Sequence, residues 1–336
     1  MSNQETKVHE ARFYEPVSDT LIGCGLCPQE CRIGSGGTGL CKVRINRDQK
    51  LTTTNFGQVS SLALDPIEKK PLYHYFPGSA IFSAGTIGCN LACEFCQNWE
   101  ISKGDGAPTR LVSPAELAEL AKSAEKQAGS IGVAYTYSEP GVWFEFLIET
   151  MPLLHEQGLK NVLVTNGFLN PGPWQELLKW TDAANIDLKG FTEEYYRKLC
   201  HGRLEPVLEN IKSAAGRIHL ELTTLIIPGE NDAPDQLREL ARWIGSIDPE
   251  IPLHLSRYFP NYKLTTAATP LETLARARDI AREYLSYVYL GNAPGGSDTY
   301  CPECGNLLIE RHGYETRVLT GESCARCGRA TGIVFH

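Results

Sequence analysis

Residues 80–96, AIFSAGTIGCNLACEFC, place three cysteines directly after a short apolar run. The apolar run predicts a β-strand, and Cys89, Cys93 and Cys96 then fall in the loop that follows it. Three thiolates cannot satisfy a cubane iron–sulfur cluster, which has four irons to ligate. One iron would therefore stay open to a ligand from another molecule. The alternative interpretation is a structural zinc site with a distant fourth ligand.

Short apolar runs and helical patterns alternate downstream of this loop. Further strands are predicted at IGVAYTY, NVLVTNG, AANIDLKG, HLELTTLIIPG and IPLHLSRYFP, and VYLGN adds a last short one. Ser113-Pro114-Ala115-Glu116 is a capping box, so a helix begins there. Six β–α units with short connections imply parallel strands, arranged as an open sheet or as a partial barrel. In either case we expect functional groups at the carboxyl ends of the strands.

Polar residues stand at these predicted strand ends, namely Glu139, Asn166, Asp187 and Lys189. Asp187 and Lys189 lie two residues apart in a strand, so they point to the same face and can reach one ligand. Each residue also has a simpler interpretation. Asn166 suits a turn, Asp187 and Lys189 suit an ion pair at a rim, and Glu139 suits a helix start.

Two further cysteine clusters flank this central region. Near the carboxyl end, two CxxC pairs separated by 19 residues are typical of a zinc ribbon: Cys301, Cys304, Cys324 and Cys327. Iron bound by the same thiolates, or no metal at all, are the alternatives. Near the amino end, four cysteines are less regularly spaced and suit zinc, an auxiliary iron–sulfur cluster or no metal: Cys24, Cys27, Cys31 and Cys41. Cys200 stands alone and is expected to be a small buried apolar residue.

Composition limits the classes of function. The chain has 336 residues with 32 Lys and Arg against 40 Asp and Glu, and this net charge of −8 argues against a general nucleic-acid binder. No apolar run is long enough to cross a membrane, and the start, MSNQETKVHEARFYEP, lacks the apolar segment of a signal peptide. We therefore expect a cytoplasmic protein whose twelve cysteines serve as metal ligands or redox groups rather than as disulfides.

These patterns predict three domains. They are an N-terminal cysteine-rich lobe, a central α/β core and a C-terminal zinc-ribbon-like lobe, at residues 1–77, 78–295 and 296–336. Within the first lobe, a polar turn at Arg47–Lys50 between apolar flanks predicts a hairpin.

The whole chain resembles a known group of enzymes. CNLACEFC, with Phe95 before the last cysteine, together with TYSEP, TNGF and NIDLKGF, is similar to the motifs of the radical SAM superfamily. With EKKPLYHYFPGS, IIPGEND, HLSRYFP and the terminal CPxCG, the chain resembles the AmmeMemoRadiSam system radical SAM enzymes, relatives of the pyruvate formate-lyase activating enzymes. This resemblance implies a partial (β/α)6 radical SAM barrel that binds a [4Fe–4S] cluster and S-adenosylmethionine.

The resemblance also implies roles for individual residues. Cys89, Cys93 and Cys96 would ligate the cluster. The S-adenosylmethionine pocket would be lined by Phe95 at the adenine, Ser138 and Glu139 at the ammonium group, Asn166, Asp187 and Lys189 near the carboxylate and ribose, and His254 closing it. Val164 stands where the activating enzymes carry an aspartate, so a monovalent cation site built on that aspartate is not expected.

The activity implied by the resemblance is reductive cleavage of S-adenosylmethionine, followed by hydrogen abstraction from an unidentified substrate. The cofactor carries this chemistry, and the protein orients it. A glycyl radical enzyme activase and a non-catalytic metal-binding scaffold are the two alternatives. Expected partners are an electron donor such as flavodoxin or ferredoxin, and Memo-like and AMMECR-like proteins or another protein substrate. Both metal lobes are expected to cover the carboxyl ends of the strands, because a radical must be kept from water.

Overall fold

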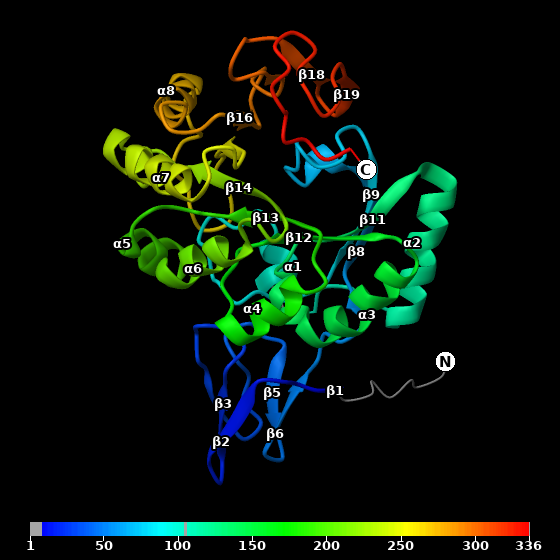
Figure 1. Cartoon of the computed structure of the whole chain (residues 1–336). Coiled ribbons are helices and arrows are strands. Elements are labelled where there is room, and N and C mark those ends of the chain that lie inside the picture. The colour runs from blue at the N-terminus through cyan, green and yellow to red at the C-terminus, as the bar shows by residue number, and fades with distance from the viewer. Residues whose placement is uncertain (1–8, 104–105, 336) are drawn as a thin grey trace.

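The computed structural model describes residues 9–103 and 106–335, and its centre is one eight-stranded sheet (Figure 1). Residues 1–8 belong to the predicted N-terminal lobe and to the start that lacks a signal-peptide pattern. They lie outside the described residues. The strand order is β16-β15-β14-β13-β12-β11-β9-β8. The parallel strands are β9 (Ala80–Gly85), β11 (Ser130–Tyr135), β12 (Lys160–Thr165), β13 (Ala183–Asp187), β14 (His219–Ile226), β15 (Leu253–Arg257) and β16 (Val288–Gly291).

Helices connect the parallel strands, as the alternating pattern predicts. They are α1 (Trp99–Lys103), α2 (Pro114–Ala128), α3 (Phe144–Glu156), α4 (Pro171–Leu178), α5 (Glu193–Tyr195), α6 (Glu205–Ala214), α7 (Pro234–Ile247) and α8 (Leu271–Ala281). The predicted capping box begins α2: Glu116 N donates to Ser113 Oγ, and Ser113 N donates to the Glu116 carboxylate. The prediction of a parallel α/β core is thus confirmed.

One strand of the sheet was not predicted. β8 (Ser61–Pro66) runs antiparallel to β9 at the edge of the sheet, although it lies within the predicted N-terminal lobe. Most of its residues are only partly buried, because an edge strand has one neighbour. Its sequence therefore lacks the apolar run that identifies the inner strands.

The N-terminal lobe consists of two small antiparallel sheets. One contains β1 (His9–Glu10), β6 (Lys50–Thr53) and β5 (Arg44–Arg47), and the other contains β2 (Tyr14–Ser18), β3 (Leu21–Cys24) and β4 (Arg32–Gly34). β5 and β6 form the predicted hairpin, with Asp48 and Gln49 at positive φ in its two-residue turn. Beside the core, β7 (Gln58–Val59) pairs with β10 (Arg110–Leu111).

A buried ion pair joins this lobe to the core. Arg44 Nη2 lies 2.6 Å from Glu145 Oε1 of α3, and both side chains are almost fully buried. Arg12 N also donates to Glu145 Oε1, and Arg44 Nη1 donates to Arg12 O. Removing one partner of such a pair leaves an unpaired charge in the interior, which is strongly destabilising.

We therefore predict that Glu145→Leu lowers the free energy of unfolding by about 3–5 kcal/mol. Chemical denaturation of the purified protein measures this change. The control is Glu209→Ala, which removes the partner of Lys212 in a solvent-exposed pair and should cost less than about 1 kcal/mol. Equal stability of the Glu145 variant and the unchanged protein would contradict the role of the pair.

The C-terminal lobe lies at the opposite end of the molecule from the N-terminal lobe (Figure 1). It contains β17 (Thr299–Tyr300), β18 (Leu307–His312) and β19 (Glu315–Val318). Arg311 Nη2 donates to Tyr73 O, and Arg329 pairs with Glu250 just before β15. These contacts are with segments at the amino ends of β9 and β15. The expectation that both lobes cover the carboxyl ends of the strands is therefore not met for the C-terminal lobe.

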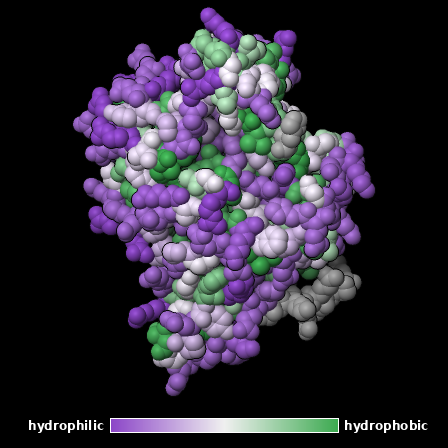
Figure 2. All heavy atoms as spheres, in the orientation of Figure 1, coloured by the Kyte–Doolittle hydropathy of each residue, from purple (hydrophilic) through white to green (hydrophobic). Residues whose placement is uncertain are grey.

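Figure 2 shows a mostly hydrophilic face, with hydrophobic residues in small separate groups. Across residues 9–103 and 106–335, no helix combines the length and apolar character that crossing a bilayer requires.

Candidate functional site

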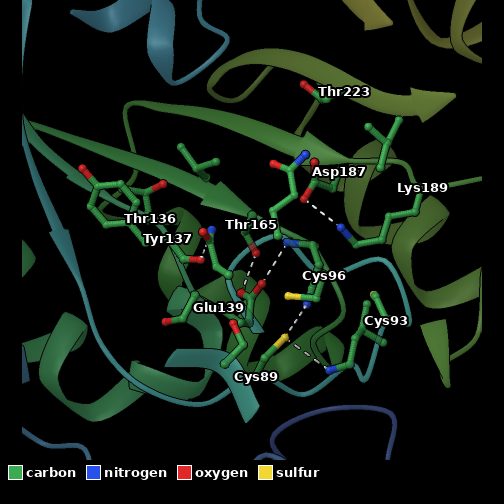
Figure 3. Close-up of a pocket in the computed structure, with 18 of the residues that line it drawn as sticks. Cys89, Cys93, Cys96, Thr136, Tyr137, Glu139, Thr165, Asp187, Lys189 and Thr223 are labelled. Atoms are coloured by element: carbon green, nitrogen blue, oxygen red, sulfur yellow. Dashed lines mark hydrogen bonds and ion pairs between the residues drawn. The ribbon is translucent and has the colours of Figure 1, made fainter. Parts of the chain in front are cut away.

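One cavity of about 460 Å³ lies at the carboxyl ends of the strands and gathers most of the predicted site residues. A volume in this range suits a small-molecule ligand. Figure 3 shows the cysteine loop grouped near Glu139 and the Asp187–Lys189 pair. The predicted residues that line it are Cys89, Cys93, Phe95, Cys96, Ser138, Glu139, Asn166, Asp187 and Lys189.

The cysteine loop follows β9 and is held by contacts from two directions. Ala92 N donates to Cys200 O, at the end of a π-helical turn, Tyr196–Cys200. On the other side, Lys103 Nζ donates to Cys89 O at 2.7 Å. Burial raises the pKa of the Cys89 thiol to about 12, so its thiolate needs a positively charged partner. An iron–sulfur cluster would supply that partner, and three soft thiol donors around one cavity fit it.

Glu139 ties the end of β11 to the end of β12. Its buried carboxylate accepts hydrogen bonds from Gly141 N, Thr165 Oγ1 and Asn166 N, at 2.7, 2.7 and 2.8 Å. Burial raises the pKa of Glu139, and these donors and Lys189 partly oppose that rise. Glu139 also caps the short 3-10 turn Pro140–Trp143. It therefore has both of the positions considered from the sequence, at a helix start and in the pocket.

Asp187 and Lys189 stand at the end of β13 and pair with each other. Lys189 Nζ lies 2.9 Å from Asp187 Oδ2, and both side chains line the cavity, as their shared face predicts. Burial alone lowers the pKa of Lys189, but the opposing effect of negative charge, chiefly that of Asp187, is larger. The pKa of Lys189 is therefore raised, and its ammonium group stays charged beside the cysteines.

His254 is the one predicted pocket residue that lies away from this cavity. Its Nε2 is 2.6 Å from Glu221 Oε2 on the neighbouring strand β14, and its ring packs against Tyr73 and Tyr289. His254 is 3% exposed. Glu221 could not be identified from the sequence as the partner of His254, because cross-strand neighbours depend on strand register. The geometry of His254 is therefore that of a buried core histidine whose hydrogen bond is satisfied by Glu221.

Basic residues that were not predicted line another part of the cavity. Lys69 and Lys70 both pair with Asp65 of β8, at 2.8 and 2.7 Å. Tyr137 donates its hydroxyl to Asp65 Oδ2, and Lys70 Nζ lies over the Tyr137 ring. Burial raises the pKa of Asp65, but the hydrogen bonds from Lys69, Lys70 and Tyr137 outweigh it and hold that pKa far below its usual range. The two adjacent lysines in EKKPLYHYFPGS are the sequence feature that could have indicated this basic part of the cavity.

The ribbon cysteines converge on one point. The Sγ atoms of Cys301, Cys304, Cys324 and Cys327 all lie within 4.8 Å of one another. The Sγ atoms of Cys301 and Cys327 are 3.6 Å apart, and so are those of Cys304 and Cys324. This arrangement suits one metal ion bound by four thiolates.

The N-terminal cysteines surround a second, smaller cavity. Cys24, Cys27, Cys31 and Cys41 line it together with Arg44. The structure thus brings these four cysteines to one place, as their shared metal-binding role would require.

We predict that Glu139→Gln destabilises the protein even without cofactor. Gly141 N, Thr165 Oγ1 and Asn166 N all donate hydrogen bonds to the Glu139 carboxylate. The NH2 group of a glutamine side chain would replace one of the two accepting oxygens and would face a donor there. The loss should be about 1–3 kcal/mol in the free energy of unfolding, by chemical denaturation. Thr165→Val, the control, removes one donor without adding another and should cost less. A Glu139→Gln variant as stable as the unchanged protein would refute this anchoring role.

Comparisons with known proteins agree with this geometry. A sequence profile of the radical SAM superfamily matches residues 84–244. The uncharacterized protein MJ0808 of Methanocaldococcus jannaschii is 42% identical over 340 residues, which cover 98% of this chain and 100% of that protein. The pyruvate formate-lyase-activating enzyme of Clostridium pasteurianum is 27% identical over 165 residues, 48% of this chain and 67% of that enzyme.

A solved structure shares the fold. The radical SAM methyltransferase from Sphaerobacter thermophilus superposes with a TM-score of 0.53, at 15% identity, over 90% of this chain and 81% of that one. At this identity the likeness concerns the fold alone. The profile match, the cysteine loop at the end of β9 and the full-length relative lead to one conclusion: the chain belongs to the radical SAM superfamily, as a relative of the pyruvate formate-lyase-activating enzymes.

Proposed function

We propose that this radical SAM enzyme cleaves S-adenosylmethionine reductively and abstracts hydrogen from its substrate, as a member of the AmmeMemoRadiSam group. One observation carries the proposal: nine residues chosen from the sequence line a single cavity. The membership in the finer group is supported by the motifs along the whole chain and by the 42% identical full-length relative.

The cavity residues fit the cofactor. Cys89, Cys93 and Cys96 would ligate three irons of a [4Fe–4S] cluster. Ser138 Oγ is buried and has no hydrogen-bond partner among the described residues, so it is available to a polar group of a ligand. Glu139 would attract an ammonium group, and Lys189 a carboxylate. When bound, the cluster and S-adenosylmethionine supply a carbon-centred radical that abstracts hydrogen.

Other residues shape the environment of the reaction. Leu91 and Phe95 provide apolar walls that exclude water from the reacting centre. Lys69 and Lys70, which also line the cavity, favour a substrate with negative charge. An acidic protein segment or an anionic metabolite has this property.

Partners follow from the chemistry and from the resemblance. Reductive cleavage needs one electron from a low-potential donor such as flavodoxin or ferredoxin. The group resemblance suggests a Memo-like protein and an AMMECR-like protein as neighbours or targets. Anaerobic pull-down with the cofactor-loaded protein identifies such partners directly.

A glycyl radical enzyme activase is the second candidate. It is favoured by the similarity to the activating enzyme of Clostridium pasteurianum, although that similarity covers 48% of this chain. An activase would produce a glycyl radical on its partner protein. Electron paramagnetic resonance of the incubated partner distinguishes this outcome from the modification of another target.

The test of the proposed function is the combined variant Cys89→Ala, Cys93→Ala and Cys96→Ala. It should lose the iron of this site and form no 5′-deoxyadenosine after anaerobic reconstitution, because the cluster has lost its three thiolate ligands. Chromatography of the reaction mixture measures the nucleoside. The ribbon metal serves as the internal control and should be retained. Deoxyadenosine formation at the unchanged rate would rule out this cavity as the site.

The ribbon metal is proposed to be zinc. Tetrahedral zinc with Zn–S bonds of about 2.3 Å places thiolates about 3.8 Å apart, close to the 3.6 Å between the ribbon pairs. Cys324→Ser should lose zinc in elemental analysis and become sensitive to protease in the lobe, because the metal supplies folding free energy. Tyr314→Ala, an exposed ribbon change, should keep its zinc. Iron in place of zinc, with both metals supplied, would overturn the assignment.

A further inference from the structure

The four N-terminal cysteines form what we call the N-lobe cysteine site: Cys24, Cys27, Cys31 and Cys41. All four line one small cavity with Arg44, Asn90 and Val142, and none is in a disulfide. Three of them are buried and Cys31 is half-buried. Four soft donors around one buried cavity suit a metal group, and the spacing of the sulfur atoms indicates its size.

The sulfur spacing in the N-lobe cysteine site differs from that in the ribbon. Within residues 9–103 and 106–335, the ribbon set is the one group of three or more ligand atoms that lie within 4.8 Å of one another. The N-lobe thiols therefore stand farther apart than a single zinc ion allows. A larger inorganic core, with one thiolate on each of several irons, tolerates that wider spacing.

The radical SAM cysteines provide a reference within the same chain. Cys89, Cys93 and Cys96 also line one cavity without converging within 4.8 Å. They belong to the superfamily's cluster loop, where the group to be held is a cubane rather than a single ion. The N-lobe cysteine site shares this open arrangement, and it has a fourth thiol to close the cluster.

Arg44 supplies the second observation. Its guanidinium is 1% exposed and lines the N-lobe cavity. Nη1 and Nη2 are used by Arg12 O and Glu145, but Nε has no hydrogen-bond partner among the described residues. A buried donor without a partner is costly unless a ligand accepts from it. Sulfur atoms of a cluster are such acceptors, and hydrogen bonds to them raise the reduction potential.

We propose that Cys24, Cys27, Cys31 and Cys41 ligate a second [4Fe–4S] cluster, to which Arg44 Nε donates a hydrogen bond. Asn90 lines the N-lobe cavity, while its chain neighbours Cys89 and Leu91 line the main cavity. One residue thus separates the two sites along the chain. The second cluster takes one electron from a low-potential protein donor and passes it to the first, and is thereby reoxidised. This relay rests on the proposed function, but the metal assignment does not.

The metal is tested in the variant that lacks Cys89, Cys93 and Cys96, so that iron at the main site cannot contribute. The protein is reconstituted anaerobically with iron, sulfide and zinc together. We expect about four irons and four acid-labile sulfides per chain, with the signal of a reduced [4Fe–4S] cluster in electron paramagnetic resonance. One extra zinc without sulfide, or no metal at this site, would overturn the proposal.

Ligand identity is tested in the same background. Adding Cys27→Ser and Cys31→Ser should remove the remaining iron and sulfide, while Cys200→Ala, a buried cysteine outside the N-lobe cavity, should leave them unchanged. Circular dichroism checks that both proteins are folded. Iron retained without Cys27 and Cys31 would refute these ligands.

Arg44→Lys keeps the positive charge and removes the Nε donor. We expect a more negative reduction potential for the second cluster at unchanged iron content, whereas the exposed Arg47→Lys should not shift it. An unchanged potential would refute the hydrogen bond.

The relay has a separate readout in the otherwise unchanged enzyme. Cys27→Ser with Cys31→Ser should slow deoxyadenosine formation with reduced flavodoxin at least tenfold, while S-adenosylmethionine binding stays the same. An equal rate would refute the relay and leave the metal assignment to the iron and sulfide analysis.

Discussion

The buried carboxylate of Glu139 sets the positions on which the cysteine loop depends. It accepts a hydrogen bond from Asn166 N. The Asn166 side chain in turn donates to Asn90 Oδ1 at 2.9 Å and to Cys89 Sγ at 3.6 Å. Asn90 Nδ2 continues the network to Phe168 O. The ends of β11 and β12 and the loop after β9 are therefore one hydrogen-bonded unit. Such a unit is rigid because each buried polar group in it loses a partner if another moves.

This network also connects the core to the N-terminal lobe. Gln29 Nε2 donates to Asn90 O, and Asn90 forms part of the N-lobe cavity wall. The lobe is fixed from the other side by the buried Arg44–Glu145 pair, and Arg12 N adds a hydrogen bond to the same carboxylate. The result is that Asn90, which lines the N-lobe cavity, stands in the chain between Cys89 and Leu91, which line the main cavity.

The parallel core and nine pocket residues could be predicted from sequence because both depend on local patterns. A strand ends where its apolar run ends, and in a parallel sheet all such ends meet at one edge. Partnerships across strands could not be predicted in this way. Glu221 on β14 reaches His254 on β15 through strand register, and Lys70 reaches Asp65 of β8 because the 3-10 turn Ile67–Lys69 brings it back beside the strand. Ser61–Pro66 was missed because an edge strand needs no continuous apolar run.

The distant ribbon is connected to the cavity through the segment that carries Lys69 and Lys70. Thr316 donates to Glu68 Oε1, and Val334 N donates to His74 O, so the ribbon holds both ends of this segment. Lys70 can then keep its charge in a buried place, since Asp65 is held 2.7 Å away. Because burial alone lowers the pKa of Lys70, any loosening of the segment that separates it from Asp65 would favour its neutral form. The ribbon thereby supports the positive part of the cavity without touching the cofactor end.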